Sequence, residues 1–255
     1  MSKLAASALV LSALLTGTAA AEPVRPTVVL VHGAFADSSS WNGVIAALQS
    51  KGYPVVAAAN PLRSVASDAA YVSDIVGSID GPVVLVGHSY GGQVITTAAN
   101  GHDNVKSLVY VAAFAPDAGE AAADLAGKFP GGTLGEALAA PVKLNSGGVD
   151  LYIDQGKFRA QFAHDVPEAD AARMAVGQRP ITEAALTEKS GEPAWKRLPS
   201  WFVYGDGDKN IPARALEFMA DRAGSRHTVV VKGASHVVMV SSPDVVADLI
   251  DEAAR

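Results

Sequence analysis

The sequence predicts one α/β domain, in which a mainly parallel six-stranded sheet is flanked by helices and a helical cap is inserted after the fourth strand. Three observations support this prediction. Short, continuously apolar segments alternate with longer segments whose apolar residues recur at helical spacing. Continuously apolar strands are typical of a parallel sheet that is covered on both faces. The alternation stops between about residues 116 and 197 and then resumes, which indicates a cap over the strand ends.

The first half of the sheet can be followed element by element. The apolar run at 27–31 is the first expected strand, and the helix expected at 41–50 ends near Gly52. A second apolar run at 55–59 is the second strand. Residues 66–79 carry apolar side chains at helical spacing and are expected to form the next helix.

The third strand is expected at 83–86 and leads through a tight turn into a helix over 93–100. A fourth strand at 105–114 precedes the cap, which is expected at about 116–197. The remaining expected elements are strands at 201–204 and 228–231 and helices at 215–223 and 243–254.

Gly87, Ser89 and Gly91 form a Gly-x-Ser-x-Gly pattern between the third strand and its helix. This strand–turn–helix setting is typical of a nucleophile elbow. The turn holds the serine in a strained conformation, and a side chain on either flanking residue would collide with the adjoining strand or helix. We therefore expect Ser89 to be a nucleophile whose hydroxyl oxygen projects above the sheet.

A serine nucleophile needs a general base, which must lie at the same sheet end, in a loop that follows a strand. Of the six histidines, His236 follows the sixth strand and meets these conditions. The other five are expected at less suitable places: His32 braces the loop after the first strand, His88 adjoins Ser89 without facing it, His102 ends a helix, His164 lies in the cap, and His227 begins the sixth strand.

The base needs a carboxylate to orient it, and the loop after the fifth strand supplies Asp206 and Asp208 as candidates. Either choice places serine, aspartate and histidine in the chain order that is typical of hydrolases built on such a sheet.

An oxyanion hole requires two N–H donors near the serine. One is expected from Tyr90, the residue after the nucleophile, and the second from the loop after the first strand. In that loop Gly33 permits a close backbone approach, and the N–H of Phe35 or of Ala34 is the candidate donor.

Residues 27–250 resemble the α/β-hydrolase superfamily. The resemblance is carried by His32-Gly33, by the elbow at 87–92, by Gly205-x-x-Asp208 with Pro212, and by the histidine after the last strand. It implies that Asp208 is the triad carboxylate, with Asp206 as a turn residue, and that Phe35 is preferred to Ala34 as the second oxyanion donor.

Residues 208–212 and 233–243 are also similar to the small methyl-esterase and hydroxynitrile-lyase group. The lyases of that group carry a lysine directly after the catalytic histidine and a threonine after the first-strand histidine. Those positions are Val237 and Gly33 in this sequence. The resemblance therefore implies an esterase rather than a lyase.

Together these residues imply a serine hydrolase that cleaves small to medium carboxylic esters through an acyl-enzyme on Ser89. The same fold also supports cofactor-free perhydrolysis, hydrolysis of lactones or amides, or binding of a ligand without turnover. The ester mechanism needs neither a metal nor an organic cofactor.

Aromatic side chains of the cap region are candidates for the substrate pocket. An apolar acyl or alcohol group is expected to contact Phe114, Phe129, Tyr152, Phe162 and Trp195, with Leu134, Leu138, Phe158 and Met174 as further candidates. The alternative is that these side chains anchor the cap to the core.

Composition limits the partners and the compartment. A 49% hydrophobic content suits one well-formed core, and a net charge of −6 leaves no basic surface for nucleic acid. There are no cysteines, which excludes disulfides and thiolate metal sites. The partner is therefore expected to be a small-molecule ester.

The first residues have the pattern of a signal peptide. Lys3 precedes an apolar segment at 4–15 and small residues at 16–21, and the apolar segment is too short for a membrane anchor. We expect cleavage near Ala21 and export to the periplasm or the medium, with residues 22–255 forming the hydrolase domain.

Overall fold

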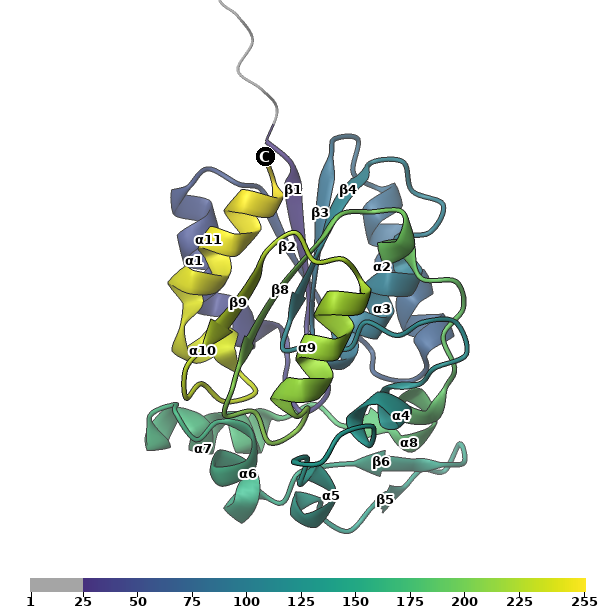
Figure 1. Ribbon diagram of the computed structural model, residues 1–255. Coiled ribbons are helices and arrows are strands. Elements are labelled where there is room, and N and C mark those ends of the chain that lie inside the picture. Colours follow the sequence, from purple (N-terminus) through teal and green to yellow (C-terminus); the bar gives the residue numbers. More distant parts are fainter. Residues whose placement is uncertain (1–24) are drawn as a thin grey trace, which may run out of the picture.

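The computed structural model describes residues 25–255 (Figure 1). The signal peptide expected at 1–21 lies outside the described residues. The fold class expected from the sequence is confirmed, because six strands form one sheet in the order β2-β1-β3-β4-β8-β9, and every neighbouring pair is parallel. The six strands are β1 (Thr27–Val31), β2 (Val55–Ala58), β3 (Val83–His88), β4 (Val105–Val111), β8 (Ser200–Gly205) and β9 (Thr228–Val231).

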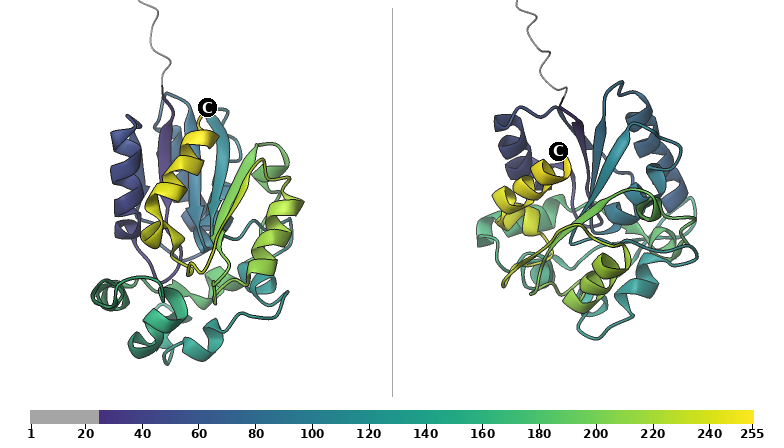
Figure 2. Two further views of the ribbon diagram at one scale, coloured as in Figure 1. Left: turned by 60° about the vertical axis from the view of Figure 1, so that its left-hand side comes forward. Right: turned by 45° about the horizontal axis from the view of Figure 1, so that its top comes forward.

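Helices cover both faces of the sheet (Figures 1 and 2). One face carries α1 (Asn42–Ser50) and α11 (Pro243–Ala253), which pack against each other. The other face carries α2 (Val65–Gly77), α3 (Tyr90–Ala98) and, beside β8, α9 (Ala213–Arg222). Because both faces are covered, β3 is buried along its whole length, as its continuously apolar sequence predicts.

Two element boundaries differ from the sequence prediction near the centre of the sheet. Helix α3 begins at Tyr90, directly after Ser89, rather than three residues later. Strand β4 ends at Val111 rather than at 114, because Ala112 adopts a φ of +44° and turns the chain. The turn allows the N–H of Phe114 to donate to the carbonyl oxygen of Ser89, over 3.1 Å.

The segment between β4 and β8 forms the expected cap over the carboxyl ends of the main strands (Figure 1). Its helices are α4 (Ala122–Ala126), α5 (Leu134–Ala137), α6 (Gln155–Phe162), α7 (Glu168–Gly177) and α8 (Glu183–Thr187). It also contains a small antiparallel sheet that the sequence did not predict, made of β5 (Val142–Lys143), β6 (Val149–Leu151) and β7 (Ile181–Thr182). Strands of two or three residues are too short for a recognisable period.

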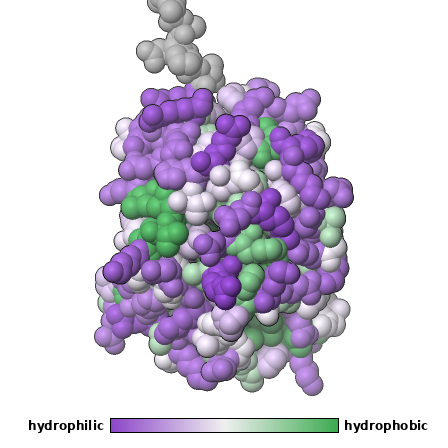
Figure 3. All heavy atoms as spheres, viewed as in Figure 1, coloured by the Kyte–Doolittle hydropathy of each residue, from purple (hydrophilic) through white to green (hydrophobic). Residues whose placement is uncertain are grey.

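Three short elements complete the described chain: the 3-10 helices η1 (Ser38–Trp41) and η2 (Ala194–Lys196), and the helix α10 (Val238–Ser241), which precedes α11. None of the helices within residues 25–255 is long and apolar enough to cross a membrane. Polar side chains cover most of the face seen in Figure 3, and apolar ones gather there in separate patches.

Candidate active site

Ser89 occupies a sharp turn between β3 and α3, with a φ of +52° that L-residues rarely adopt. Glycines make this turn possible. A Cβ atom on Gly87 would lie 2.6 Å from the carbonyl oxygen of Gly91, and one on Gly91 would lie 2.4 Å from that of Val31. Both separations are far below van der Waals contact, so the strand, the turn and the helix approach this closely only with glycine at both positions.

Three of the residues singled out by the sequence lie in hydrogen-bond contact. Nε2 of His236 is 2.8 Å from Oγ of Ser89, and Nδ1 of His236 is 2.6 Å from Oδ2 of Asp208. The side chains of His236 and Asp208 are buried. The other carboxylate oxygen of Asp208 accepts the backbone N–H groups of Asn210 and Ile211, which hold it in place.

Asp206 takes no part in the hydrogen bonds that link Ser89, His236 and Asp208. Its side chain is exposed, and Oδ1 accepts the backbone N–H of Gly233. It thereby connects the loop after β8 with the loop that carries His236. The contact therefore joins two loops, with partners 27 residues apart in the sequence, and differs from the local turn contact that was expected of Asp206.

Two aromatic rings, those of Phe162 and His88, pack against the imidazole of His236. The ring of Phe162 lies edge-on to it with a centroid separation of 5.1 Å, and the ring of His88 lies at 4.8 Å. Nε2 of His88 also hydrogen-bonds the carbonyl oxygen of His236, over 3.1 Å. Burial, reinforced by the nearby His236, holds the pKa of His88 well below its ordinary value, so its neutral Nε2–H donates this bond.

The cap also contacts the loop that carries the histidine. Oδ2 of Asp165 accepts the backbone N–H of Ser235 over 3.0 Å, and Nε2 of His164 lies 3.2 Å from the carbonyl oxygen of Gly233. Sequence reasoning placed His164 in the cap and missed Asp165. No sequence pattern relates Asp165 to a loop some 70 residues away.

The structure does not support the preference for Phe35 over Ala34 as the second oxyanion donor. The N–H of Phe35 donates to the carbonyl oxygen of Arg179 over 2.9 Å and is therefore occupied. Within residues 25–255, the N–H groups of Tyr90 and Ala34 have no hydrogen-bond acceptor, and both residues line the cavity at Ser89. The geometry thus favours Ala34 over Phe35 as the second donor.

His32 braces this loop, as expected. Its Nδ1 hydrogen-bonds the carbonyl oxygen of Gly33, and its own carbonyl oxygen accepts the side-chain amide of Asn60. Burial lowers the pKa of His32.

A cavity of about 280 Å³ lies at Ser89. Apolar side chains make up most of its wall, chiefly Phe114, Ala122, Ala123, Ala126, Leu134, Leu138, Leu186 and Ile211. Helix α4 presents only alanines to it, which leaves room for a compact apolar group.

Of the five aromatic residues expected in the substrate pocket, Phe114 lines this cavity and four do not. Phe162 packs against His236, and Phe129 packs against Phe218 with ring centroids 5.7 Å apart. The indole N–H of Trp195 donates to the carbonyl oxygen of Pro116, which anchors the end of the cap. Tyr152 lies next to the small cap sheet, where its carbonyl oxygen accepts the N–H of Ala139.

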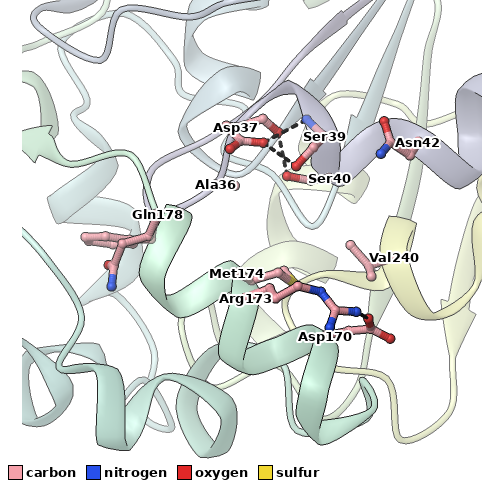
Figure 4. A pocket seen from close by; sticks show the side chains of 12 residues that line it. Ala36, Asp37, Ser39, Ser40, Asn42, Asp170, Arg173, Met174, Gln178 and Val240 are labelled. Atoms are coloured by element: carbon pink, nitrogen blue, oxygen red, sulfur yellow. Dashed lines mark hydrogen bonds and ion pairs between the residues drawn. The ribbon is translucent and has the colours of Figure 1, made fainter.

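A second cavity, of about 350 Å³, lies between α7 and the segment after β1 (Figure 4). It contains neither Ser89 nor His236. Its charged side chains already have partners, because Asp37 accepts from Ser39 and Arg173 pairs with Asp170. The candidate active site is therefore the cavity at Ser89.

Comparisons with known proteins agree with this architecture. A family model described as "Alpha/beta hydrolase family" matches residues 28–249. The chain is 27% identical over 252 residues to the alpha/beta hydrolase nvfD of Aspergillus novofumigatus, across 91% of this chain and 97% of that protein. It is 27% identical over 242 residues to the alpha-hydroxynitrile lyase of Arabidopsis thaliana, across 86% of this chain and 93% of that enzyme.

Among solved structures, polyneuridine aldehyde esterase is similar with a TM-score of 0.76 at 19% identity, across 90% of this chain and 99% of that one. At this identity the likeness shows the fold alone. The family model confirms the resemblance to the α/β-hydrolases that was inferred from the sequence.

Proposed function

The chain belongs to the alpha/beta hydrolase family, and on that basis we propose that it is a serine esterase that cleaves small to medium carboxylic esters. Support comes above all from one observation, the hydrogen-bonded relay from Ser89 through His236 to Asp208. A serine hydroxyl is a weak nucleophile until a base removes its proton, and this relay supplies that base in the required orientation.

In the acylation step, Nε2 of His236 accepts the proton of Ser89 as Oγ attacks the ester carbonyl carbon. The buried carboxylate of Asp208 holds the imidazole and stabilises the imidazolium that forms. The N–H groups of Tyr90 and Ala34 donate to the oxyanion of the tetrahedral intermediate. When the intermediate collapses, the imidazolium gives its proton to the departing alcohol, and the acyl group stays on Oγ.

In the deacylation step, His236 accepts a proton from a water molecule, and the resulting nucleophile attacks the acyl-enzyme. The second tetrahedral intermediate uses the same two N–H donors. Its collapse returns the proton to Ser89 and releases the carboxylic acid.

The cavity supports compact substrates. A volume of about 280 Å³ with alanine and leucine walls suits a short acyl or alcohol group better than a long lipid chain. Selectivity for such groups is expected to be modest, because each methylene buried in an apolar pocket contributes only about 1 kcal/mol.

The lyase activity named for one relative is not favoured here. The sequence resemblance associates that chemistry with a lysine directly after the catalytic histidine. The corresponding Val237 is apolar and buried, so it supplies no cation to the cavity.

We also propose that the protein is exported after cleavage near Ala21, because residues 1–21 have the pattern of a signal peptide. The mass of the purified native protein tests this proposal. A mature chain that begins at Ala21 or Glu22 supports it, and a chain that retains residues 1–21 overturns it.

The proposed activity is tested with a panel of esters whose acyl and alcohol parts vary separately in length, using wild type and Ser89→Ala. The wild type should hydrolyse the short esters, and Ser89→Ala should lose about 10³-fold or more of kcat. Wild-type rates in Ser89→Ala would overturn the assignment of the nucleophile.

A further inference from the structure

The cavity at Ser89 contains one polar side chain for which the ester mechanism has no use. Three of the residues that line it carry polar side chains, namely Ser89, Tyr90 and Asn210. Ser89 is the proposed nucleophile, and the hydroxyl of Tyr90 is engaged with Asp68 over 3.0 Å. The side-chain amide of Asn210 remains.

The side-chain amide of Gln161 determines the orientation of the Asn210 amide, that is, the positions of its Oδ1 and Nδ2 atoms. Nε2 of Gln161 donates to the carbonyl oxygen of Lys209, over 3.0 Å. Because a carbonyl oxygen can only accept, that atom of Gln161 is the nitrogen. The same Nε2 lies 2.8 Å from the amide of Asn210, so the atom of Asn210 that faces it must be Oδ1.

Nδ2 of Asn210 therefore points away from Gln161. It has no hydrogen-bond acceptor within the part of the chain that the structure describes. Nδ2 is also not fully buried, so part of its surface can be reached from outside. Asn210 is 5% exposed and lines the cavity, and Nδ2 is the polar atom of its side chain that is left free to bind a ligand.

The loop after β8 holds Asn210 close to the catalytic relay. Its backbone N–H donates to Oδ1 of Asp208 over 2.7 Å, and the other oxygen of that carboxylate binds His236. The free amide is thus held rigidly, two residues beyond the proposed triad carboxylate, in an otherwise apolar wall. A rigid donor in such a wall discriminates strongly between ligands with and without an acceptor, because a purely apolar ligand leaves the donor unpaired.

We propose that Nδ2 of Asn210 donates a hydrogen bond to a substrate oxygen other than those of the scissile ester. The preferred substrates are then compact esters that carry an ether or carbonyl oxygen in the group that fills the cavity. This inference rests on the proposed esterase function and specifies the substrate class of the same site.

Two pairs of isosteric esters test it, each exchanging one methylene for an ether oxygen. Ethyl 3-methoxypropanoate and ethyl pentanoate differ in the acyl part, and 2-methoxyethyl acetate and butyl acetate differ in the alcohol part. The quantity measured is the ratio of kcat/KM for the ether ester to that for the methylene ester. Comparing this ratio between enzymes cancels the intrinsic reactivity of each ester.

Asn210→Leu removes the donor, and Asn210→Asp keeps an oxygen for Gln161 while replacing Nδ2 by a second oxygen. In at least one pair, both variants should lower the ratio by about five- to tenfold relative to wild type. Thr133→Val is the matched control. It removes the hydroxyl that donates to Oε1 of Gln161 but leaves the bond of Gln161 to Lys209, so the ratio should stay at the wild-type value.

Ratios that agree among wild type, Asn210→Leu and Asn210→Asp in both pairs would overturn the inference, as long as hydrolysis depends on Ser89. If Asn210→Leu does not fold, the isosteric Asn210→Asp decides alone. Failure of the esterase function itself is a separate result, because it would appear as hydrolysis that persists in Ser89→Ala.

Discussion

The phenolic hydroxyl of Tyr90 donates a hydrogen bond, 3.0 Å long, to Oδ2 of the fully buried Asp68. Both oxygens of that carboxylate also accept the backbone N–H of Arg63. The guanidinium of Arg63 binds Asp150 and the carbonyl oxygen of Pro180, both in the cap. A continuous set of polar contacts thus connects the residue after the nucleophile with the cap.

Replacing Tyr90 by phenylalanine should test this connection. The change removes one donor from a buried carboxylate, and burial already raises the pKa of Asp68 above its ordinary value. We expect the free energy of unfolding to fall by about 1–3 kcal/mol. The proposed oxyanion donor is a backbone N–H and remains, so kcat should fall by less than about tenfold.

Urea unfolding at neutral pH measures the loss, with Tyr71→Phe as the control because Tyr71 is an exposed tyrosine. Equal stability of the two variants would mean that the bond from Tyr90 to Asp68 contributes nothing to the fold.

The two aspartates after β8 should differ sharply in kinetics. Asp208→Asn keeps the shape of the side chain but favours the wrong tautomer of His236, so kcat should fall by roughly 10³- to 10⁴-fold. Asp206→Asn retains an oxygen for the N–H of Gly233, and its kcat should change by less than about tenfold. Both variants are assayed on the same short ester. A large loss in Asp206→Asn with little change in Asp208→Asn would reverse the assignment.

The sequence was sufficient where chemistry restricts a position to one residue type. The elbow requires glycine at 87 and 91, and these glycines identified both the turn and Ser89. The position of the loops at the same end of the sheet then selected His236 and limited the carboxylate to Asp206 or Asp208, and the resemblance to the α/β-hydrolases chose Asp208. That reasoning works because a parallel sheet brings the carboxyl ends of its strands together.

The sequence was insufficient where a contact depends on the path of the cap. The resemblance implied Phe35 as the preferred oxyanion donor, but its N–H donates to the carbonyl oxygen of Arg179, whose position relative to β1 no local pattern reveals. The same reason explains why Phe162 was expected in the pocket but packs against His236. Asn210 was missed because its significance arises from Gln161, which fixes the direction of its amide.

Gly91→Ala should show how closely the elbow is packed. The added Cβ would lie 2.4 Å from the carbonyl oxygen of Val31, a backbone atom of β1 that cannot move without disturbing the sheet. We expect a loss of about 3 kcal/mol in the free energy of unfolding, or insoluble protein.

Gly177→Ala is the matched control for this change, because a Cβ at this last residue of α7 meets no atom within 4 Å. Its stability should stay the same or rise by up to about 1 kcal/mol. Similar losses in the two glycine variants would show that the close approach at Gly91 is not what requires glycine there.

His88 should make the stability of the protein depend on pH. Burial holds its pKa well below the ordinary value of 6.5, and the nearby His236 and His32 act in the same direction. Between the lowered pKa and 6.5, the unfolded chain binds a proton that the folded protein does not. The contribution of His88 is therefore complete above about pH 6.5 and is lost as the pH falls, by up to about 1.4 kcal/mol per pH unit.

His88→Gln is expected to weaken this dependence, because glutamine keeps an N–H donor for the carbonyl oxygen of His236 but does not titrate. The test is urea unfolding of wild type and variant at about pH 7.5, 6 and 5. Groups that titrate in this range without interacting with His88 cancel in the comparison. The free energies of the two proteins should converge as the pH falls from 7.5 to 5. Curves that remain parallel over that range would show that His88 binds its proton equally well in the folded and unfolded states, contrary to its burial beside His236.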